Sequence, residues 1–206
     1  VLNRYMRNIG TCISGGGANI AAILKAAQTQ NWKSQFSAQI AAVISNKADA
    51  AGLAFAKEQS IPSLFIDHKA YASREAFEAD LMQQIDTYQP ALLVLAGFMR
   101  ILTPAFVSNY EGRILNIHPS LLPAFTGLHT HQRAIDAACK FAGATVHRVS
   151  SELDAGTILA QAVVPILPDD TEQTLAARVL TQEHLIYPKV IASLLATKAT
   201  MATSVK

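Results

Sequence analysis

Short apolar runs alternate with longer amphipathic segments through the first part of the chain. The apolar runs predict strands that are covered on both faces, and they occupy residues 8–14, 37–45, 91–97 and 112–118. Helical spacing of apolar positions predicts helices between these strands, over residues 19–30, 48–60 and 73–88. Ser73 is the expected N-cap of the third helix. Strands that alternate with helices in this way indicate βαβ units and a parallel sheet.

The pattern changes in the later part of the chain. Residues 144–149 and 157–166 have the pattern of strands with little helix between them, and a long helix is expected over roughly 172–196. The predicted fold class is therefore α/β, with a doubly wound, mostly parallel sheet and a smaller mixed C-terminal half.

No repeat, low-complexity segment or linker divides the chain. We therefore predict a single domain over residues 6–196, with halves 6–110 and 111–196, and tails at 1–5 and 197–206. Met6 directly precedes the first expected strand and is the expected natural start, which would make residues 1–5 an upstream remnant.

Composition narrows the class of protein. Half of the 206 residues are hydrophobic, which suits one globular domain. A net charge of +2 argues against a nucleic-acid surface and leaves small-molecule ligands open. The two cysteines, Cys12 and Cys139, lie far apart and favour reduced thiols in a cytoplasmic protein. No apolar run approaches the ~18 residues that a membrane helix needs, so no membrane partner is expected.

The glycine-rich stretch SGGGAN at residues 14–19 follows a strand and opens a helix. Backbone N–H groups at a helix N-terminus favour a phosphate. The stretch lacks the lysine of a P-loop and the spacing of a dinucleotide-binding turn. A phosphate cradle and a simple tight turn, with Asn19 as the helix cap, both remain open from these residues alone.

Asn116 and His118 lie at the end of a strand, and residues two apart in a strand face the same way. The carboxyl ends of strands are where open α/β sheets bind ligands. An amide donor beside an imidazole that can carry a proton is suited to stabilising an oxyanion. The alternative is that both side chains only satisfy buried backbone groups.

Two carboxylates also stand out. Asp154 lies in an Asp-Ala-Gly turn, which is ordinary turn chemistry unless the side chain reaches His118 and favours the protonated ring. Glu183 falls inside an apolar helical stripe, formed by Leu175, Val179, Ile186, Val190 and Leu194. A carboxylate on a buried face is costly unless it is paired. Glu183 is therefore expected to meet a basic group or to border a cleft.

The histidines have no metal-ligand spacing, and no metal is expected.

Several stretches together resemble the folate-dependent formyltransferases, over about residues 6–195. They read NIHPSLLP, GLHTHQRAI, GATVH, ELDAGTILAQ, LAGFMRIL and TQEHLIYP. The resemblance implies a Rossmann-like formyltransferase fold and transfer of a formyl group from 10-formyltetrahydrofolate, a co-substrate, to glycinamide ribonucleotide. It also implies that the half over 6–110 binds phosphate and that the half over 111–196 is the catalytic and folate side. Small-molecule substrates and a monomer or weak homodimer are expected.

The resemblance also assigns roles to single residues. It implies that Asn116, His118 and Asp154 are catalytic. It implies that the substrate-binding residues are Gly17, Ala18, Asn19 and Glu183. It implies that the folate-binding residues are Arg74, Met99, Arg100, Ile101, Leu102 and Asn116. Two positions depart from the family pattern: Ala18 replaces a serine of the phosphate loop, and Leu180 stands where some relatives carry glutamine.

Other functions share parts of this pattern. Methionyl-tRNA formyltransferase and formyltetrahydrofolate deformylase resemble the same core but normally carry an additional domain, which favours the glycinamide ribonucleotide reaction. A non-catalytic nucleotide-binding module would need the glycine turn but none of the three catalytic residues. A nicotinamide-dependent enzyme is disfavoured, because Asn46 stands where an acidic residue is expected at the end of the second strand.

Overall fold

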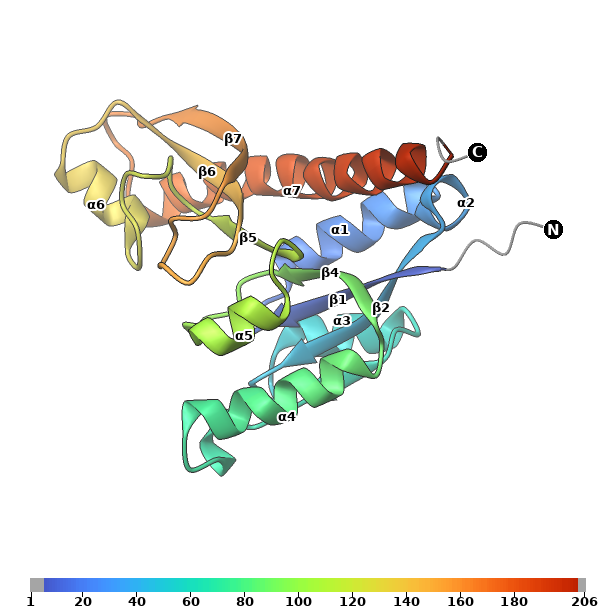
Figure 1. Cartoon of the computed structure of the whole chain (residues 1–206). Helices are drawn as coiled ribbons and strands as arrows, with labels where there is room; N and C mark the ends of the chain where they lie inside the picture. Colours follow the sequence, from blue (N-terminus) through green and yellow to red (C-terminus); the bar gives the residue numbers. More distant parts are fainter. Residues whose placement is uncertain (1–5, 204–206) are drawn as a thin grey trace.

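The computed structural model describes residues 6–203 and contains a single sheet of seven strands (Figure 1). The strands are β1 (Arg7–Ile13), β2 (Ala38–Ser45), β3 (Ser63–Phe65), β4 (Pro90–Leu95), β5 (Ile114–His118), β6 (Phe141–Arg148) and β7 (Ile158–Pro165). Their order in the sheet is β3-β2-β1-β4-β5-β6-β7. The first five are parallel, and β6 and β7 extend the sheet by antiparallel pairing. The predicted fold class is confirmed.

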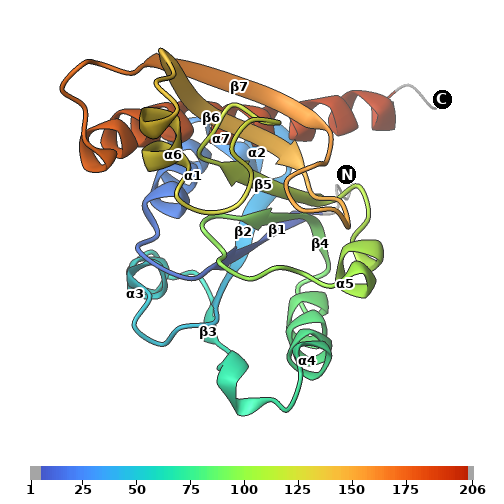
Figure 2. The same ribbon diagram turned by 90° about the vertical axis from the view of Figure 1, so that its left-hand side faces the viewer.

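The helices are α1 (Ala18–Thr29), α2 (Trp32–Phe36), α3 (Ala51–Glu58), the 3₁₀ helix η1 (His68–Ala70), α4 (Arg74–Asp86), α5 (Pro104–Asn109), α6 (Thr130–Asp136) and α7 (Glu172–Thr203). Helices α1 and α7 run side by side over one face of the sheet, and α4 lies on the other (Figures 1 and 2). None of the helices in the described part combines the length and apolar character needed to cross a bilayer.

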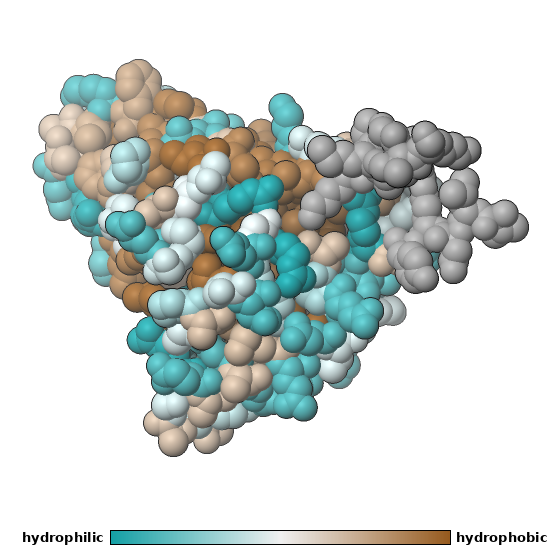
Figure 3. Space-filling model, viewed as in Figure 1, coloured by the Kyte–Doolittle hydropathy of each residue, from teal (hydrophilic) through white to brown (hydrophobic). Residues whose placement is uncertain are grey.

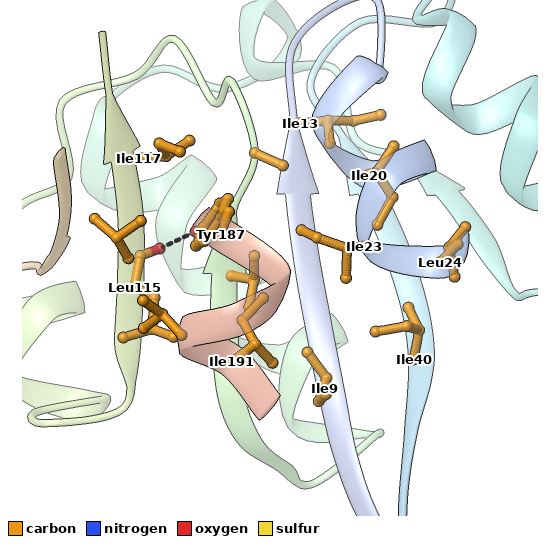
Figure 4. Packing of buried hydrophobic residues seen from close by; sticks show 14 of the residues in the cluster. Ile9, Ile13, Ile20, Ile23, Leu24, Ile40, Leu115, Ile117, Tyr187 and Ile191 are labelled. Carbon is orange, nitrogen blue, oxygen red and sulfur yellow. Dashed lines mark hydrogen bonds between the residues drawn. The ribbon is translucent and has the colours of Figure 1, made fainter. Parts of the chain in front are cut away.

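Each face of the sheet buries its own apolar cluster. The cluster beneath α1 and α7 joins side chains of β1 and β5 to both helices, and includes Ile9, Ile23, Leu115 and Ile191 (Figure 4). The cluster on the opposite face packs α4 and α5 against alternate residues of the same strands. Burial of a large aliphatic side chain stabilises the fold by about 1.5–3 kcal/mol, so these clusters hold the strand ends in fixed positions.

Tyr187 connects α7 to the centre of the sheet. Its side chain is fully buried, and its hydroxyl lies 2.8 Å from the Leu95 carbonyl and 3.0 Å from the Leu115 carbonyl (Figure 4 labels Tyr187 and Leu115). A buried hydroxyl is costly without such partners. The contact therefore fixes α7 to the end of β4 and to the residue of β5 that precedes Asn116.

The expected strands and the helices over 19–30, 48–60 and 73–88 are all present with shifted ends. The Ser73 hydroxyl accepts a hydrogen bond from the Ala76 N–H at 3.1 Å, which confirms the N-cap of α4. Helix α7 continues to Thr203, beyond the expected end near 196, because no glycine or proline in that segment stops it. The expected remnant at 1–5 lies outside the described residues.

Candidate active site

A cavity of about 730 Å³ opens at the carboxyl ends of β4 and β5, where the sheet changes from parallel to antiparallel. Its walls come from residues 97–102, 116–119, 127–131, 147 and 149–154, with Asn19 and Glu183 at one side. Both halves of the chain therefore contribute to the lining. Met99, Ile101 and Leu128 of these walls are more than half exposed, and exposed large apolar side chains are typical of ligand-binding grooves. Hydrophobic surface also gathers over the upper part of the face that Figure 3 shows.

Asn116 and His118 both line this cavity from β5, as their spacing predicts. The Nε2 atom of His118 lies 3.0 Å from the Phe125 carbonyl oxygen, and Nδ1 lies 3.5 Å from Oδ2 of Asp154. Both ring nitrogens therefore face acceptors. An imidazolium can donate to both, whereas a neutral ring can donate to only one.

Asp154 comes from the turn between β6 and β7, where its backbone has a φ of 52°. That conformation is uncommon for a residue other than glycine. The Gly127 N–H donates a hydrogen bond to Oδ2 of Asp154 at 2.9 Å. The side chain of Asp154 is only 7% exposed. The carboxylate is thus buried, fixed from the β5–α6 loop and directed at His118, as the hypothesis for this turn predicts.

His147 stands opposite Asn116 in the antiparallel β5–β6 pair. Its Nδ1–H donates to the Arg148 carbonyl at 3.0 Å, which leaves Nε2 to accept from the Asn116 amide nitrogen at 3.3 Å. Burial lowers the pKa of His147, against the opposing effects of the Arg148 carbonyl and Asp154, so the ring is neutral at physiological pH. A neutral His147 therefore fixes the orientation of the Asn116 amide, because the amide nitrogen must face His147 to donate to it.

Asn19 and Glu183 meet at the side of the cavity nearest α1. The Asn19 amide nitrogen donates to Oε2 of Glu183 at 2.7 Å. Burial raises the pKa of the Glu183 carboxyl, and the bond from Asn19 and the nearby His184 and His118 oppose the rise. Glu183 was expected either to meet a basic group or to border a cleft. It borders the cavity, so the second expectation is confirmed. The alternative that Asn19 caps α1 is wrong, since Gly17 is the N-cap and no side chain caps this helix.

Of the three glycines in the SGGGAN turn, Gly17 is the one that no other residue could replace without strain. Its φ is 70°, and a Cβ atom there would lie 2.5 Å from the Cα atom of Gly52. Gly15 and Gly16 have open space on the Cβ side. The turn thus brings the start of α1 close to α3 and leaves the first N–H groups of α1 without a side-chain partner.

The segment 97–102 is anchored at both ends. At one end the Ser14 hydroxyl accepts the Met99 N–H at 2.8 Å and donates to Asn46 at 2.6 Å. At the other end the buried Glu78 accepts both the N–H and the hydroxyl of Thr103, the N-cap of α5. A buried carboxylate with these donors is stable. The two anchors hold an apolar wall of the cavity in place.

Comparisons with known proteins identify the family of this chain. The family model for formyl transferases matches residues 7–191. The chain belongs to the formyl transferase family.

Among the relatives of this formyl transferase is phosphoribosylglycinamide formyltransferase of Escherichia coli (strain K12), which is 50% identical over 184 residues, covering 89% of this chain and 85% of the relative. The solved structure of phosphoribosylglycinamide formyltransferase from Coxiella burnetii has a TM-score of 0.86 at 48% identity, and the match covers 93% of this chain and 88% of that one. The enzyme of the same name from Brucella melitensis has a TM-score of 0.86 at 50% identity, with 92% and 96% of the two chains covered.

Not every residue that the sequence singled out borders the cavity of this formyl transferase. Asn19, Glu183, Asn116, His118, Asp154 and residues 99–102 all line it. Gly17, Ala18 and Leu180 do not line it, and neither does Arg74, which is exposed in the first turn of α4. Arg74 lies one helical turn before Phe77, whose ring is 5.9 Å from the Arg100 guanidinium carbon.

The sequence did not predict the structural roles of two residues in the site, His147 and Ser14. The sequence pattern assigned His147 no role of its own, although the alternation of ATVH along a strand places Thr145 and His147 on one face. Ser14 shows no signal in the sequence, because its contact with Met99 joins residues 85 positions apart. Within the described residues, no group of three or more His, Cys, Asp or Glu side chains could hold a metal ion.

Proposed function

We propose that this formyl transferase moves a formyl group from 10-formyltetrahydrofolate to the amine of N1-(5-phosphoribosyl)glycinamide, a step of de novo purine biosynthesis. The relatives that match most of its length carry the name of that activity. The observation that carries the proposal is the arrangement of Asn116, His118 and Asp154 around one cavity that also reaches Asn19 and Glu183. Two small substrates can meet there at a protonatable ring.

In this proposal the acceptor amine attacks the formyl carbon directly. A C–N bond forms, the formyl oxygen takes negative charge and the attacking nitrogen becomes positively charged. The bond to the donor nitrogen then breaks as that nitrogen takes a proton from His118, and the proton released by the attacking amine restores the ring. Asn116 and His118 hold the oxygen as it becomes negative, and His118 supplies a proton through Nδ1. Preorganised donors of this kind are worth about 3–4 kcal/mol each in the barrier.

Asp154 has the role of stabilising and orienting the imidazolium. Its Oδ2 atom lies 3.5 Å from Nδ1, which is longer than a strong charged hydrogen bond. That separation favours a ring that is attracted to the carboxylate but can still share its Nδ1 proton with a substrate oxygen. The Phe125 carbonyl holds the other N–H and so fixes the ring plane.

The acceptor substrate is proposed to bind at the side of α1. Its phosphate would lie at the N-terminus of α1, where Gly17 and Ala18 offer backbone N–H groups and the helix carries no acidic residue in its first turn. Ala18 supplies no hydroxyl, so backbone groups and Asn19 would carry this contact. Glu183 would accept hydrogen bonds from the ribose hydroxyls.

The folate co-substrate is proposed to bind against residues 99–102. Met99 and Ile101 present large exposed side chains next to the buried Leu102, and the cavity volume is in the range of small-molecule sites. The backbone of this segment offers N–H and carbonyl groups to a flat heterocycle. Arg74 and Arg100 remain proposed contacts for the acidic part of the folate.

Strict dependence on the acceptor tests the proposed function. Consumption of 10-formyltetrahydrofolate by the purified protein is expected only when glycinamide ribonucleotide is present, and the formylated ribonucleotide should appear in equal amount. Folate consumption without the acceptor would instead indicate a deformylase, in which water takes the place of the amine. Binding of both ligands without turnover would indicate a non-catalytic module.

Replacing Glu183 by glutamine is expected to raise the KM for glycinamide ribonucleotide about tenfold with little change in kcat. Glutamine keeps the shape but loses the charge that strengthens a hydrogen bond to a hydroxyl, a loss of about 1.5 kcal/mol or more. Since the pKa of Glu183 is raised by burial, the wild-type KM should rise as pH falls toward that pKa, whereas the variant should not respond.

Steady-state kinetics at several pH values measure this effect. Glu75→Gln, an exposed carboxylate in the first turn of α4 and outside the cavity lining, is the matched control. A variant whose KM equals that of the control would remove Glu183 from the acceptor site.

A cytoplasmic location and a monomeric or weakly dimeric state belong to the same proposal. The reduced state of Cys12 and Cys139, which are both free, agrees with the location.

A further inference from the structure

The β5–α6 loop contacts both members of the His118–Asp154 pair through its own backbone. The Phe125 carbonyl accepts from Nε2 of His118 at 3.0 Å. The Gly127 N–H donates to Asp154 at 2.9 Å. The relative position of the ring and the carboxylate therefore depends on where residues 125–127 lie.

The first part of the loop is held from the core. The fully buried Thr145 hydroxyl donates to the Ser120 carbonyl at 2.7 Å and accepts the Leu122 N–H at 3.0 Å. The Ser120 hydroxyl in turn donates to the Ala124 carbonyl at 2.6 Å. Residues 119–124 are thus fixed by groups that water cannot reach.

The second part of the loop is irregular and lies nearer to solvent. Phe125 and Gly127 have φ values of 53° and 75°, and Thr126 and Leu128 are exposed. A segment with this backbone conformation forms no ladder with a neighbouring strand. Its carbonyls therefore bond to side chains or to water instead of to a neighbouring strand.

Arg133 supplies those partners from α6. One guanidinium nitrogen, Nη1, donates to the Thr126 carbonyl at 2.6 Å and approaches the Leu128 carbonyl at 3.2 Å. The guanidinium carbon lies 5.4 Å from the centre of the Phe125 ring, in range for a cation–π contact. Arg133 itself does not line the cavity.

We propose that Arg133 is a positioning residue: it holds residues 125–128 so that the Phe125 carbonyl fixes the His118 ring and the Gly127 N–H fixes Asp154. The inference rests on the proposed function for its kinetic consequence. It acts through the loop backbone, at a distance from either substrate. A flat guanidinium suits the task because it can donate hydrogen bonds and stack on the ring at the same time, whereas a lysine ammonium is a point charge without a planar face.

Replacing Arg133 by methionine tests the proposal, because methionine keeps much of the apolar stem but has no donor. We expect kcat to fall about tenfold, since a small misplacement of a catalytic group is costly. The KM for glycinamide ribonucleotide should stay within about twofold, because Asn19 and Glu183 lie outside the loop. Arg133→Lys should recover part of the lost kcat.

Gln132→Ala is the matched control on the same helix. The Gln132 amide bonds Asp136 within α6 at 2.7 Å, so this variant loses a hydrogen bond of the helix while leaving Arg133 in place. Its kcat should remain within about twofold of the wild type. Thermal denaturation of all variants should show whether the fold is retained.

A second measurement does not depend on turnover. In protein labelled with ¹⁵N-histidine, the His118 ring signals, assigned by comparison with His118→Gln, should shift or broaden in Arg133→Met and stay unchanged in Gln132→Ala. Wild-type kcat in Arg133→Met, or an equal loss in the control, would overturn the proposal, as would unchanged His118 signals. If the wild-type protein transfers no formyl group, the proposed function fails, while the spectra still decide whether Arg133 positions the ring.

Discussion

Replacing His118 by glutamine is expected to lower kcat about a thousandfold while leaving the affinity for both substrates within a few-fold. Glutamine can still donate a hydrogen bond, but it cannot carry the proton that the departing nitrogen needs. It also carries no positive charge that could interact with the Asp154 carboxylate. General acid catalysis is typically worth about 10²–10⁴ in rate, and loss of the oxyanion contact adds to this.

Single-turnover kinetics and calorimetric binding of glycinamide ribonucleotide separate the two effects. His68→Gln serves as the control, because that half-buried ring lies outside the cavity lining. It should stay within about twofold of the wild type, because the His68 ring borders neither proposed substrate site. If His118→Gln retains more than about a tenth of the wild-type kcat, the ring is not the proton donor.

Replacing Asn116 by alanine is expected to lower kcat about 10²–10³-fold, the usual effect of removing one oxyanion donor. Asn116→Asp keeps the shape of the side chain but places a carboxylate acceptor beside the oxygen that becomes negative. We therefore expect the aspartate variant to be no more active than the alanine variant at neutral pH. The carboxylate would also face Nε2 of His147, which the wild-type amide nitrogen approaches at 3.3 Å.

The most specific test is which of the two variants has the higher kcat. A role in shape alone would make Asn116→Asp clearly more active than Asn116→Ala, and that result would contradict the oxyanion hypothesis. Asn109→Ala, at the exposed end of α5, is the control for loss of an asparagine. Measurements of kcat at saturating substrates, with circular dichroism spectra of each variant, complete the test.

Much of the fold follows from local patterns in the sequence. The apolar runs that became β1, β2, β4 and β5 are buried on both faces, so their hydrophobicity is nearly continuous and easy to recognise. Short elements such as β3 and α5 were not predicted, because three to six residues carry too little periodicity. Their places are set by neighbours: β3 pairs with β2, and Glu78 of α4 fixes the start of α5.

The candidate site divides in the same way. Asn116 and His118 were placed together by strand alternation, and Glu183 was noticed because a carboxylate interrupts an apolar stripe. Contacts between distant segments could not be read from the chain, since hydrogen bonds such as Asn19 to Glu183 join residues 164 positions apart. The same holds for Ser14 with Met99, which are 85 positions apart.

The sequence by itself determined the α/β class, the order of the main elements and the two polar side chains at the end of β5, because these depend on periodicities of two and 3.6 residues. Only the tertiary structure decided that Asp154 faces His118, that His147 orients Asn116 and that Asn19 binds Glu183 instead of capping its helix. These outcomes depend on how the sheet and its loops bring remote backbone positions together, and a hydrogen bond forms only where that packing places donor and acceptor about 3 Å apart.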